Sequence, residues 1–431
     1  MTYTAAVSYL YSLQKHGIKL GLDTMTALVG RLGMPQARYP TLHIAGTNGK
    51  GSTAAMTAAM FQAGAHRVGL YTSPHLVEFR ERIRVDGLMI AESDIARLTE
   101  RVRGVSEPDL SPTFFEFTTA IAFQYFAESQ IDLAVLEVGL GGRFDATNVV
   151  SPVASAITTI ALDHQQYLGS TLESIAFEKA GIIKPNVPVI LGRLPDEARE
   201  TIERIATERN APLSCLGRDF QVAGETPAHF SYSGFGARYD DLSCPLLGAH
   251  QLANCACALS LVEAAKRHRL AIGEAAIRKG LREVQWEGRL EVVARDPLTV
   301  LDGAHNPGAA QALADYLRAF RLSNPLSRVI LVLAMMRDKD HRGFVEPLHG
   351  LVDEVVLTQA DLKRSATVEE LLPIIGGIWP QLRTNTRVAG ALGEARRLAR
   401  PEDLICVTGS LMLVGEVKAS LRGIGMSPLR G

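Results

Sequence analysis

The chain lacks the usual marks of proteins that depend on disulfides or membranes. Its five cysteines are an odd number at irregular spacing with no Cys-x-x-Cys pair, which argues against a disulfide scaffold and a structural zinc site. No run of about 18 apolar residues occurs, and no basic region precedes the first apolar residues. These absences predict a reduced, cytoplasmic protein without a membrane span.

An excess of one charge is also missing. The 45 Lys and Arg residues against 46 Asp and Glu residues give a net charge of −1, so nothing indicates a nucleic-acid or acidic-lipid partner. Repeats and low-complexity tracts are absent as well. A chain of 431 residues, 47% hydrophobic and 21% charged, is typical of a globular protein with two or three domains.

The most informative stretch is 41–53, which reads Thr-Leu-His-Ile-Ala-Gly-Thr-Asn-Gly-Lys-Gly-Ser-Thr. A β-prone run at 41–45 leads into a glycine-rich loop at 46–51, and an Ala- and Met-rich helix is expected at 53–62. Glycines let backbone N–H groups approach an anion, a helix N-terminus attracts negative charge, and Lys50 adds a positive charge. The stretch therefore predicts a phosphate-binding loop.

This loop departs from the common spacing of Gly, four residues and Gly-Lys-Ser/Thr, because it is shorter and Gly51 follows Lys50. Ser52 is therefore the expected magnesium-binding hydroxyl, with Thr53 as the alternative. A glycine-rich turn with a solvated lysine is the structural alternative to a phosphate site.

Polar residues stand at the ends of two further apolar runs, 131–138 and 153–162, which we expect to be strands of a parallel sheet. Glu137 lies at the end of the first, and Asp163 and His164 follow the second. In open α/β sheets the carboxyl ends of the strands form the ligand side. Glu137 is thus a candidate for holding magnesium or its water, although a strand-end carboxylate can also be only a polar terminus.

Three more segments carry candidate ligand groups. Residues 139–148 form a second glycine-rich loop that offers Asp145 and Asn148, and residues 72–75 bring hydroxyls and an imidazole. Residues 79–84 are dense in arginine, which fits either a charged strand face or a ligand clamp.

The pattern predicts an α/β protein with two domains. An N-terminal P-loop NTPase-like parallel-sheet domain is expected over 1–285, with a small β excursion at about 220–247. Strands and helices alternate afresh over 298–431, which predicts a smaller, Rossmann-like α/β domain with right-handed crossovers. Residues 286–297 are the expected linker, and we expect a hinge near 284–297 that closes when ATP and folate bind.

Nine short motifs, spread from residue 41 to about 417, together resemble folylpolyglutamate synthase, including the bacterial bifunctional dihydrofolate synthase type, within the Mur ligases. They are Gly46-Thr-Asn-Gly-Lys-Gly-Ser52, Ser73-Pro-His75, Glu137-Val-Gly-Leu-Gly-Gly-Arg-Phe-Asp-Ala-Thr-Asn148, Asp163-His164, Glu178-Lys-Ala-Gly-Ile-Ile-Lys184, His250-Gln-Leu-Ala-Asn254, Gly288-Arg289, Asp302-Gly-Ala-His-Asn-Pro307 and Thr408-Gly-Ser410. Two departures are Phe144, where Leu is common, and Glu287, where Pro often precedes Gly-Arg.

The resemblance implies an ATP-dependent amide ligase. It would phosphorylate the carboxylate of dihydropteroate or of a reduced folate and then transfer the acyl group to L-glutamate. Three alternatives stay open: a polyglutamate synthase without the dihydrofolate activity, a Mur-type ligase with another carboxylate acceptor, and a P-loop nucleotide switch or phosphotransferase.

The resemblance also implies roles for residues. ATP-binding residues would be Thr47, Asn48, Gly49, Lys50, Gly51, Ser52, Thr53, Asn254, Arg289 and Asp302. Ligands of two Mg²⁺ ions would be Ser52, Glu137, His164 and Lys179. Folate or pterin would contact Ser73, His75, Arg82 and Asp145, and glutamate would contact His305 and Ser410. Direct catalytic roles would fall to Lys50, Lys179 and His305.

Lys179 matches a lysine that is carbamylated in the family. Carbon dioxide adds only to a neutral amine, so the modification requires burial or a nearby cation. Unmodified, Lys179 would interact with the dipole at a helix C-terminus. The expected partners are the small-molecule substrates alone, the expected state is a monomer, and a monovalent cation is a further candidate cofactor.

Overall fold

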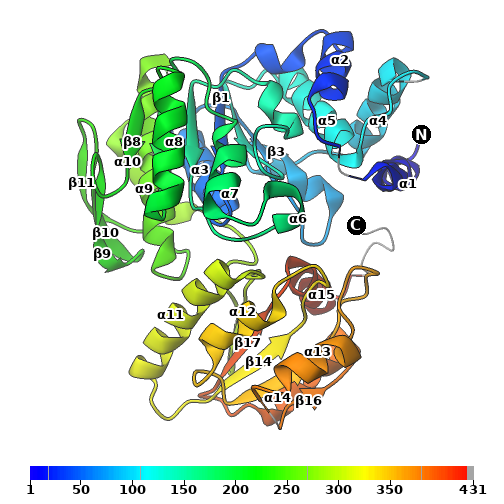
Figure 1. Ribbon diagram of the computed structural model, residues 1–431, viewed down its shortest axis with the longest axis vertical. Coiled ribbons are helices and arrows are strands. Elements are labelled where there is room, and N and C mark those ends of the chain that lie inside the picture. Colours follow the sequence, from blue (N-terminus) through cyan, green and yellow to red (C-terminus); the bar gives the residue numbers. More distant parts are fainter. Residues whose placement is uncertain (18, 107, 269, 380, 425–431) are drawn as a thin grey trace.

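The computed structural model describes residues 1–17, 19–106, 108–268, 270–379 and 381–424. It contains two α/β units, one above the other in Figure 1, with the chain passing from the upper to the lower unit after residue 284. Both units are built on sheets with mostly parallel strands, as the sequence predicted. None of the helices in the described part of the chain is long and apolar enough to cross a membrane.

The upper unit is organised around an eight-stranded sheet with the order β4-β3-β2-β5-β1-β6-β7-β8. Its strands are β1 (Thr41–Ala45), β2 (Val68–Tyr71), β3 (Ile83–Val85), β4 (Leu88–Met89), β5 (Leu133–Glu137), β6 (Ala154–Ile157), β7 (Val189–Leu191) and β8 (Leu213–Cys215). Six neighbouring strands run parallel, in the order β2, β5, β1, β6, β7 and β8. The strands β3 and β4 form an antiparallel edge beside β2. β1 lies between β5 and β6, so the loops after these three strands meet at one edge.

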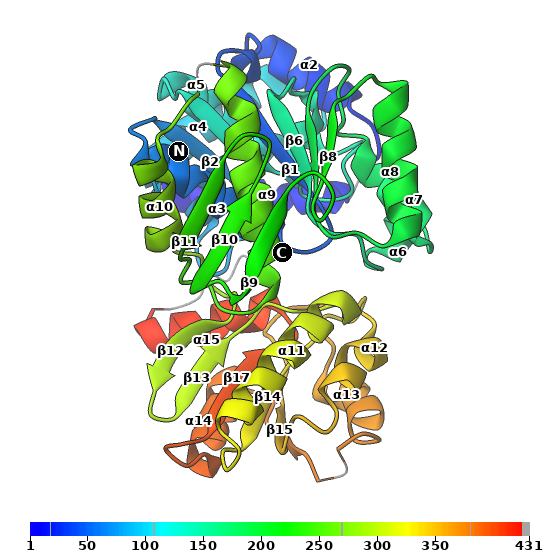
Figure 2. The ribbon, with the colours of Figure 1, turned by 90° about the vertical axis from the view of Figure 1, so that its left-hand side faces the viewer.

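Helices cover both faces of this sheet (Figures 1 and 2). They are α1 (Tyr3–Ser12), α2 (Asp23–Arg31), α3 (Lys50–Ala63), α4 (Glu92–Ser106), α5 (Phe114–Glu128), α6 (Gln165–Leu168), α7 (Leu172–Ala180), α8 (Asp196–Glu208), α9 (His250–Ala265) and α10 (Glu274–Glu283). Helices α3, α9 and α10 share one hydrophobic cluster, and α1, α2, α4 and α5 share another. Both clusters bury β-strand side chains, as expected for a sheet covered on two sides.

A small antiparallel sheet lies where the sequence predicted a β excursion. It consists of β9 (Gln221–Thr226), β10 (His229–Ser233) and β11 (Arg238–Leu242), and it stands in front of α9 in Figure 2. Buried Phe230 and Tyr232 join it to the cluster that contains α9. The Tyr232 hydroxyl also donates a hydrogen bond to Glu263 of α9 (2.6 Å).

The lower unit has a six-stranded sheet with the order β12-β13-β17-β14-β15-β16. Its strands are β12 (Glu291–Arg295), β13 (Leu298–Leu301), β14 (Val329–Leu333), β15 (Glu354–Leu357), β16 (Arg383–Thr384) and β17 (Leu404–Thr408). Its helices are α11 (Pro307–Ser323), α12 (His341–Val345), α13 (Val368–Ile375), α14 (Val388–Leu398) and α15 (Leu411–Arg422). All strands except β12 are parallel, and the loops after β13, β14 and β17 face the upper unit.

Part of the predicted linker 286–297 is a strand. β12 pairs with β13 as an antiparallel hairpin, with Glu291 opposite Leu301, and so belongs to the lower sheet. Val292 and Val293 are half-buried against this sheet, as their β-branched side chains favour. The turn with Pro297 that follows made this segment resemble a linker in the sequence. The connection between the two units is therefore shorter than predicted.

The strand predicted over 153–162 ends early, at Ile157. Beyond it, Thr158 and Thr159 donate hydroxyl hydrogen bonds to the carbonyl oxygen of Asn48 (2.6 and 3.0 Å). The Thr47 amide in turn donates to the Thr159 carbonyl (2.8 Å). This stretch thus supports the glycine-rich loop after β1, a role that its apolar pattern did not reveal.

Apolar and ionic contacts join the two units. Leu76 and Val77, from the loop after β2, are buried in the cluster that contains α15. Gly415 of α15 permits this approach, because a Cβ at that position would lie 2.1 Å from the Leu76 carbonyl oxygen. The loop that carries Ser73 and His75 is thus packed against the C-terminal unit.

The residue before the Gly-Arg motif is also fixed. Glu287 lies 3.2 Å from the Lys418 ammonium and 2.7 Å from the Arg422 guanidinium, both on α15. Its carboxylate therefore ties the connection to the C-terminal unit.

Candidate functional site

The glycine-rich loop joins β1 to α3, and α3 begins at Lys50, earlier than the predicted residue 53. Gly49 has a positive φ of 84°, and its carbonyl oxygen accepts the first helical hydrogen bond from the Thr53 amide (2.9 Å). The Lys50 ammonium folds back and donates to the carbonyl oxygens of Gly46 (3.0 Å) and Thr47 (3.1 Å). Its positive charge is therefore held over the loop.

Ser52 and Thr53 lie in the first turn of α3, and both are buried. The Gln251 amide lies 3.5 Å from the Ser52 hydroxyl, at the outer limit of a hydrogen bond. Among the described residues, the Thr53 hydroxyl has no hydrogen-bond partner. Either hydroxyl thus has lone pairs available, and both alternatives for the metal-binding hydroxyl remain open.

Glu137 ends β5, beside β1, and is buried. One carboxylate oxygen accepts a hydrogen bond from the Ser73 amide (3.1 Å). Burial raises the pKa of Glu137, while the nearby Lys50 charge opposes this rise. A buried carboxylate with spare lone pairs beside a lysine is suited to a divalent cation.

Lys179 lies near the end of α7 and is only 5% exposed. Its amine donates to the Gly46 carbonyl oxygen (2.9 Å), the same oxygen that Lys50 contacts. Burial, and secondly the charge of Lys50, lowers the pKa of Lys179 to about 7. The side chain thus lies in the interior beside the glycine-rich loop, and a large fraction of its amine is neutral near pH 7.

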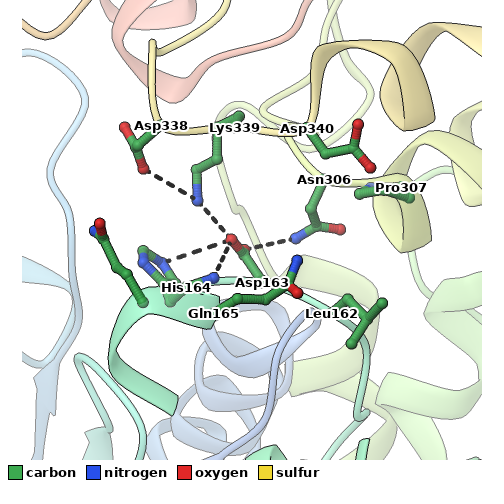
Figure 3. A pocket seen from close by; sticks show the side chains of 10 residues that line it. Leu162, Asp163, His164, Gln165, Asn306, Pro307, Asp338, Lys339 and Asp340 are labelled. Carbon is green, nitrogen blue, oxygen red and sulfur yellow. Dashed lines mark hydrogen bonds and ion pairs between the residues drawn. The ribbon is translucent and has the colours of Figure 1, made fainter. Parts of the chain in front are cut away.

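Asp163 stands where the two units meet, in the view of Figure 3. Its carboxylate accepts hydrogen bonds from Lys339 Nζ (2.7 Å) and Asn306 Nδ2 (2.9 Å), both of the C-terminal unit. His305 Nε2 lies 3.5 Å away. Burial would raise the pKa of Asp163, but the hydrogen bond from His305 and nearby positive charge, including that of Lys339, hold it below its ordinary range.

His164 follows directly, in a left-handed backbone conformation (φ 50°) at the start of α6. Non-glycine residues in this conformation are uncommon and occur often at functional sites. Burial lowers the pKa of His164 to about 4, so its imidazole is neutral near pH 7 and able to bind a metal ion. A cavity of about 110 Å³ opens beside Asp163 and His164 and is lined from the other unit by Asn306, Lys339 and Asp340.

The loop after β13 is fixed by Asp302, whose carboxylate accepts from the amides of Leu290 (2.9 Å) and Ala304 (3.0 Å). His305 Nδ1 donates to the Gly303 carbonyl oxygen (2.8 Å), which leaves Nε2 facing Asp163. Asp302 thus orders its own loop.

Two other candidates in the C-terminal half also make local hydrogen bonds. Arg289 donates to the Gly288 carbonyl oxygen (3.1 Å). The Ser410 hydroxyl caps α15 by accepting from the Met412 amide (3.1 Å). The cap places Ser410 at the N-terminus of a helix that faces the upper unit.

Asn254 of α9 lies against the glycine-rich loop. A Cβ at Gly49 would lie 2.3 Å from its side-chain oxygen, and its amide donates to Gln251 (2.8 Å). The Trp286 indole packs on the first turn of α3, because a Cβ at Gly51 would lie 2.9 Å from its ring. Gly51 therefore allows an aromatic ring to pack directly on the start of α3.

The candidate folate residues His75 and Arg82 interact with each other. Arg82 Nε donates to His75 Nδ1 (2.8 Å), so the proton of a neutral imidazole lies on Nε2, which is 3.1 Å from the Tyr11 hydroxyl. The Arg82 guanidinium also lies over the Phe114 ring (5.3 Å). Arg82 is 8% exposed and ends a 3₁₀ helix, Phe79–Arg82, so it does not lie on a charged strand face, whereas the half-exposed Arg84 does lie on a strand, β3.

Asp145 is engaged by its own glycine-rich loop. Its carboxylate accepts from the amides of Leu140 (2.9 Å) and Thr147 (3.0 Å), and from the Thr147 hydroxyl. That hydroxyl lies 2.8 Å from Nε2 of the buried His43 on β1. Asp145 is thus part of a buried chain of hydrogen bonds, a role that the sequence did not indicate.

Four residues that the sequence did not single out border the site: Gln251, Trp286, Asn306 and Lys339. Asn306 and Lys339 follow the strands β13 and β14, and a polar residue soon after a strand was the available signal. Trp286 had no comparable signal, because its contact depends on how the chain returns to α3.

The donor set fits magnesium. Within the described ranges, no three His, Cys, Asp or Glu side chains gather closely enough to hold a metal ion by themselves. A buried hydroxyl at Ser52 and a buried carboxylate at Glu137 nevertheless supply the oxygen atoms that Mg²⁺ prefers, and nucleotide phosphates and water commonly complete its coordination.

Comparison with known proteins agrees with this geometry. Residues 44–262 match the Mur ligase middle domain, and residues 288–411 match the glutamate ligase domain of Mur ligases. The dihydrofolate synthase/folylpolyglutamate synthase of Bacillus subtilis is 33% identical over 434 residues, covering 97% of this chain and 99% of that protein. A probable bifunctional folylpolyglutamate synthase/dihydropteroate synthase of Haloferax volcanii is 37% identical over 97% of this chain, which spans only 50% of that longer relative.

Solved structures are similar over the whole chain. E. coli FolC in complex with DHPP and ADP superposes with a TM-score of 0.90 at 34% identity, over 98% of both chains. A bifunctional folylpolyglutamate synthase/dihydrofolate synthase with Mn, AMPPNP and L-glutamate bound gives 0.89 at 33% identity, also over 98% of both. The chain therefore belongs to the dihydrofolate synthase/folylpolyglutamate synthase family of Mur ligases.

Proposed function

We propose that the chain is an ATP-dependent ligase that joins L-glutamate to dihydropteroate and to reduced folates. The observation that carries this is the meeting of three features between the two units: a glycine-rich loop at a helix N-terminus, two lysines on its Gly46 carbonyl oxygen, and strand-end groups from both sheets. Relatives that cover the whole chain carry this activity in their names, and solved relatives contain ADP, AMPPNP, Mn and L-glutamate.

The reaction requires activation of a carboxylate, which is a poor electrophile. The carboxylate oxygen attacks the γ-phosphorus of ATP, the bond to the ADP oxygen breaks, and an acyl phosphate forms. The neutral amine of glutamate then attacks the carbonyl carbon, the carbon–oxygen bond to phosphate breaks, and the amine loses a proton. The Lys50 charge reduces repulsion between ATP and the acceptor carboxylate, a kind of stabilisation commonly worth about 10²- to 10³-fold in rate.

For divalent metal, Ser52, with Thr53 as the alternative, and Glu137 would hold one Mg²⁺. His164 and a carbamylated Lys179 would hold a second. When bound, the metal ions neutralise phosphate charge. The buried amine of Lys179, with a pKa of about 7, supports carbamylation because carbon dioxide adds to the neutral form.

The remaining site residues divide between two substrates. His75 and Arg82 form a joined cationic and imidazole pair near Ser73, on the folate side. His305 and Ser410 lie on the loops after β13 and β17 of the C-terminal unit, and we assign them to the glutamate side. Asp145 would accept hydrogen bonds from the pterin.

One observation favours a second candidate, a folylpolyglutamate synthase without the dihydrofolate activity. Both carboxylate oxygens of Asp145 already accept hydrogen bonds within the protein. A pterin would have to share these oxygens, so the assignment of Asp145 requires a direct test.

The deciding experiment measures ADP release with Mg²⁺, ATP and L-glutamate, comparing 7,8-dihydropteroate, a reduced folate monoglutamate and no acceptor. Turnover with both acceptors is expected, and Asp145→Ala should depress the pteroate reaction more than the folate reaction. Turnover with the folate alone would support the second candidate. Turnover with neither acceptor would refute the folate assignment and favour another Mur-type acceptor.

Predictions of a monomeric state, a cytoplasmic location and a monovalent-cation requirement stand beside this proposal. Gel filtration and turnover with and without potassium ions would test the first and the last.

A further inference from the structure

Asp163 is the one carboxylate in Figure 3 that receives donors from both units. From its own unit, the His164 amide donates to Oδ1 (2.8 Å). From the C-terminal unit, Lys339 donates to Oδ1 (2.7 Å), Asn306 donates to Oδ2 (2.9 Å), and His305 Nε2 stands 3.5 Å from Oδ2. Three loops, after β6, β13 and β14, thus meet at one side chain.

The Lys339–Asp163 pair is buried, with side-chain exposures of 7% and 8%. The second carboxylate near Lys339, that of Asp338, is 4.0 Å away and also faces Arg364. Burying an ammonium and a carboxylate costs desolvation, which is offset only when the two groups meet with good geometry. Because the partners belong to different units, this pair stabilises only arrangements in which the units are together.

Asn306 links Asp163 to the glycine-rich loop. Its amide nitrogen donates to Asp163 and to the Asn48 side-chain oxygen (3.0 Å). Its side-chain oxygen accepts from Nδ2 of Asn48 (3.1 Å) and from the Ala309 backbone amide at the start of α11 (2.9 Å). Both hydrogens and both lone pairs of the Asn306 amide are used, so its orientation is fixed by its four partners.

We propose that Lys339 is a positioning residue for the ligase reaction, which holds Asp163 and, through it, Asn306 in the arrangement that pairs Asn306 with Asn48 of the phosphate-binding loop. The inference rests on the ligase function proposed above. Lys339 itself need not touch a substrate. It fixes the position of the C-terminal part of the site relative to the glycine-rich loop.

The test compares Lys339→Met, which removes the charge and keeps much of the length, with Lys339→Arg, which keeps the charge. Steady-state kinetics of K339M should show kcat reduced about tenfold or more, since a lost contact between the units lowers the population of the reactive arrangement. The KM for ATP, which both halves bind, should rise more than the KM for the folate. K339R should retain most of the wild-type kcat.

Arg342→Met is the matched control. Arg342 is three residues away in α12, 79% exposed, and pairs only with Glu346 of its own unit in the described chain, so R342M should behave as wild type. Small-angle scattering of ligand-free protein should give K339M a larger radius of gyration than wild type and R342M.

Wild-type kcat in K339M, an unchanged radius of gyration, or a K339R as impaired as K339M would each overturn the proposal. Far-UV circular dichroism checks folding, and if K339M does not fold, K339Q takes its place in both measurements. Wild-type turnover in the same assay tests the ligase function separately, and the scattering comparison stands whatever that turnover is.

Discussion

At the scale of single residues, the two lysines on the Gly46 carbonyl oxygen have different tasks. Lys50 is half-buried at the start of α3 and donates to two carbonyl oxygens of the loop, whereas Lys179 is buried and has a pKa of about 7. A lysine in an unfolded chain titrates near about 10.4, so folding lowers the pKa of Lys179 and favours the neutral amine above pH 7. Below pH 7 the ammonium form dominates and cannot add carbon dioxide.

This predicts that bicarbonate stimulates the enzyme in a pH-dependent way. In buffer freed of carbon dioxide, turnover should fall, and added bicarbonate should restore it more fully at about pH 8 than at about pH 6. Lys179→Arg keeps the charge but cannot form the carbamate, and it should lose about 10²-fold or more in kcat. Bicarbonate stimulation of K179R, or none in wild type at either pH, would contradict carbamylation.

The Thr147 hydroxyl offers a second test at this scale. Because it donates to Asp145, it must accept its other hydrogen bond from His43 Nε2, and burial lowers the pKa of His43 to about 3, so that imidazole is neutral. Thr147→Val keeps the shape but leaves the His43 donor without its partner and removes one donor to Asp145. The free energy of unfolding should fall by about 1–3 kcal/mol, measured by urea denaturation.

Thr147→Ser is the matched control, since it keeps the hydroxyl and removes one methyl group. T147S should therefore be closer to wild type than T147V. Equal stability of T147V and wild type would show that the chain of hydrogen bonds contributes nothing.

At the scale of elements, the start of α3 is shaped by the ring that packs on it. A Cβ at Gly51 would lie 2.9 Å from the Trp286 ring, so Gly51→Ala must displace either the ring or the first turn. Overpacking of this kind costs about 1–3 kcal/mol, and a displaced phosphate loop should raise the KM for ATP about tenfold. Urea denaturation and ADP-release kinetics would measure both effects.

Gly104→Ala is the control for helix propensity. Gly104 lies in α4, where a Cβ would meet no atom within 4 Å, so G104A should be stabilised by about 0.5–1 kcal/mol with unchanged kinetics. If G51A matches G104A, the packing of Trp286 on α3 is not tight.

The sequence predicted strands correctly where all the side chains of a segment are buried in the sheet. The runs that became β1 and β5 are buried along their whole length, and the sequence predicted both of them as strands. It failed at the end of β6, because Thr158 and Thr159 bond to a loop more than 100 residues away in sequence. It failed also at β12, whose pairing with β13 depends on a tight turn.

At the scale of the whole molecule, the folate-side loop depends on the C-terminal unit. Leu76 is packed on α15 at Gly415, where a Cβ would meet its carbonyl oxygen at 2.1 Å. Gly415→Ala should therefore separate this loop from α15, raise the KM for the folate acceptor several-fold and lower stability by about 1–3 kcal/mol. Acceptor titrations and calorimetry would detect the two changes.

Gly393→Ala provides the comparison within the same unit. Gly393 lies in α14 at a position where an added Cβ would have no neighbouring atom within 4 Å, so G393A should leave the acceptor KM unchanged. A G415A protein with wild-type acceptor KM would mean that the loop does not need α15 to bind folate.

The site as a whole could be predicted only in halves. Strand-end positions identified Glu137 and His164, because parallel strands within one sheet deliver their loops to one edge. Which groups of one sheet meet those of the other depends on how the units dock. The contacts of Lys339 and Asn306 with Asp163 therefore emerged only from the structure.

The Trp286 indole packs on Gly51, so its fluorescence can report on the glycine-rich loop. The sequence contains two tryptophans, and Trp379 is enclosed in the hydrophobic cluster of the C-terminal unit. Replacing Trp379 with Phe would leave Trp286 as the single indole emitter, at the start of α3. Its emission wavelength and quenching would then follow nucleotide binding in the unlabelled enzyme, in real time and without a coupled assay.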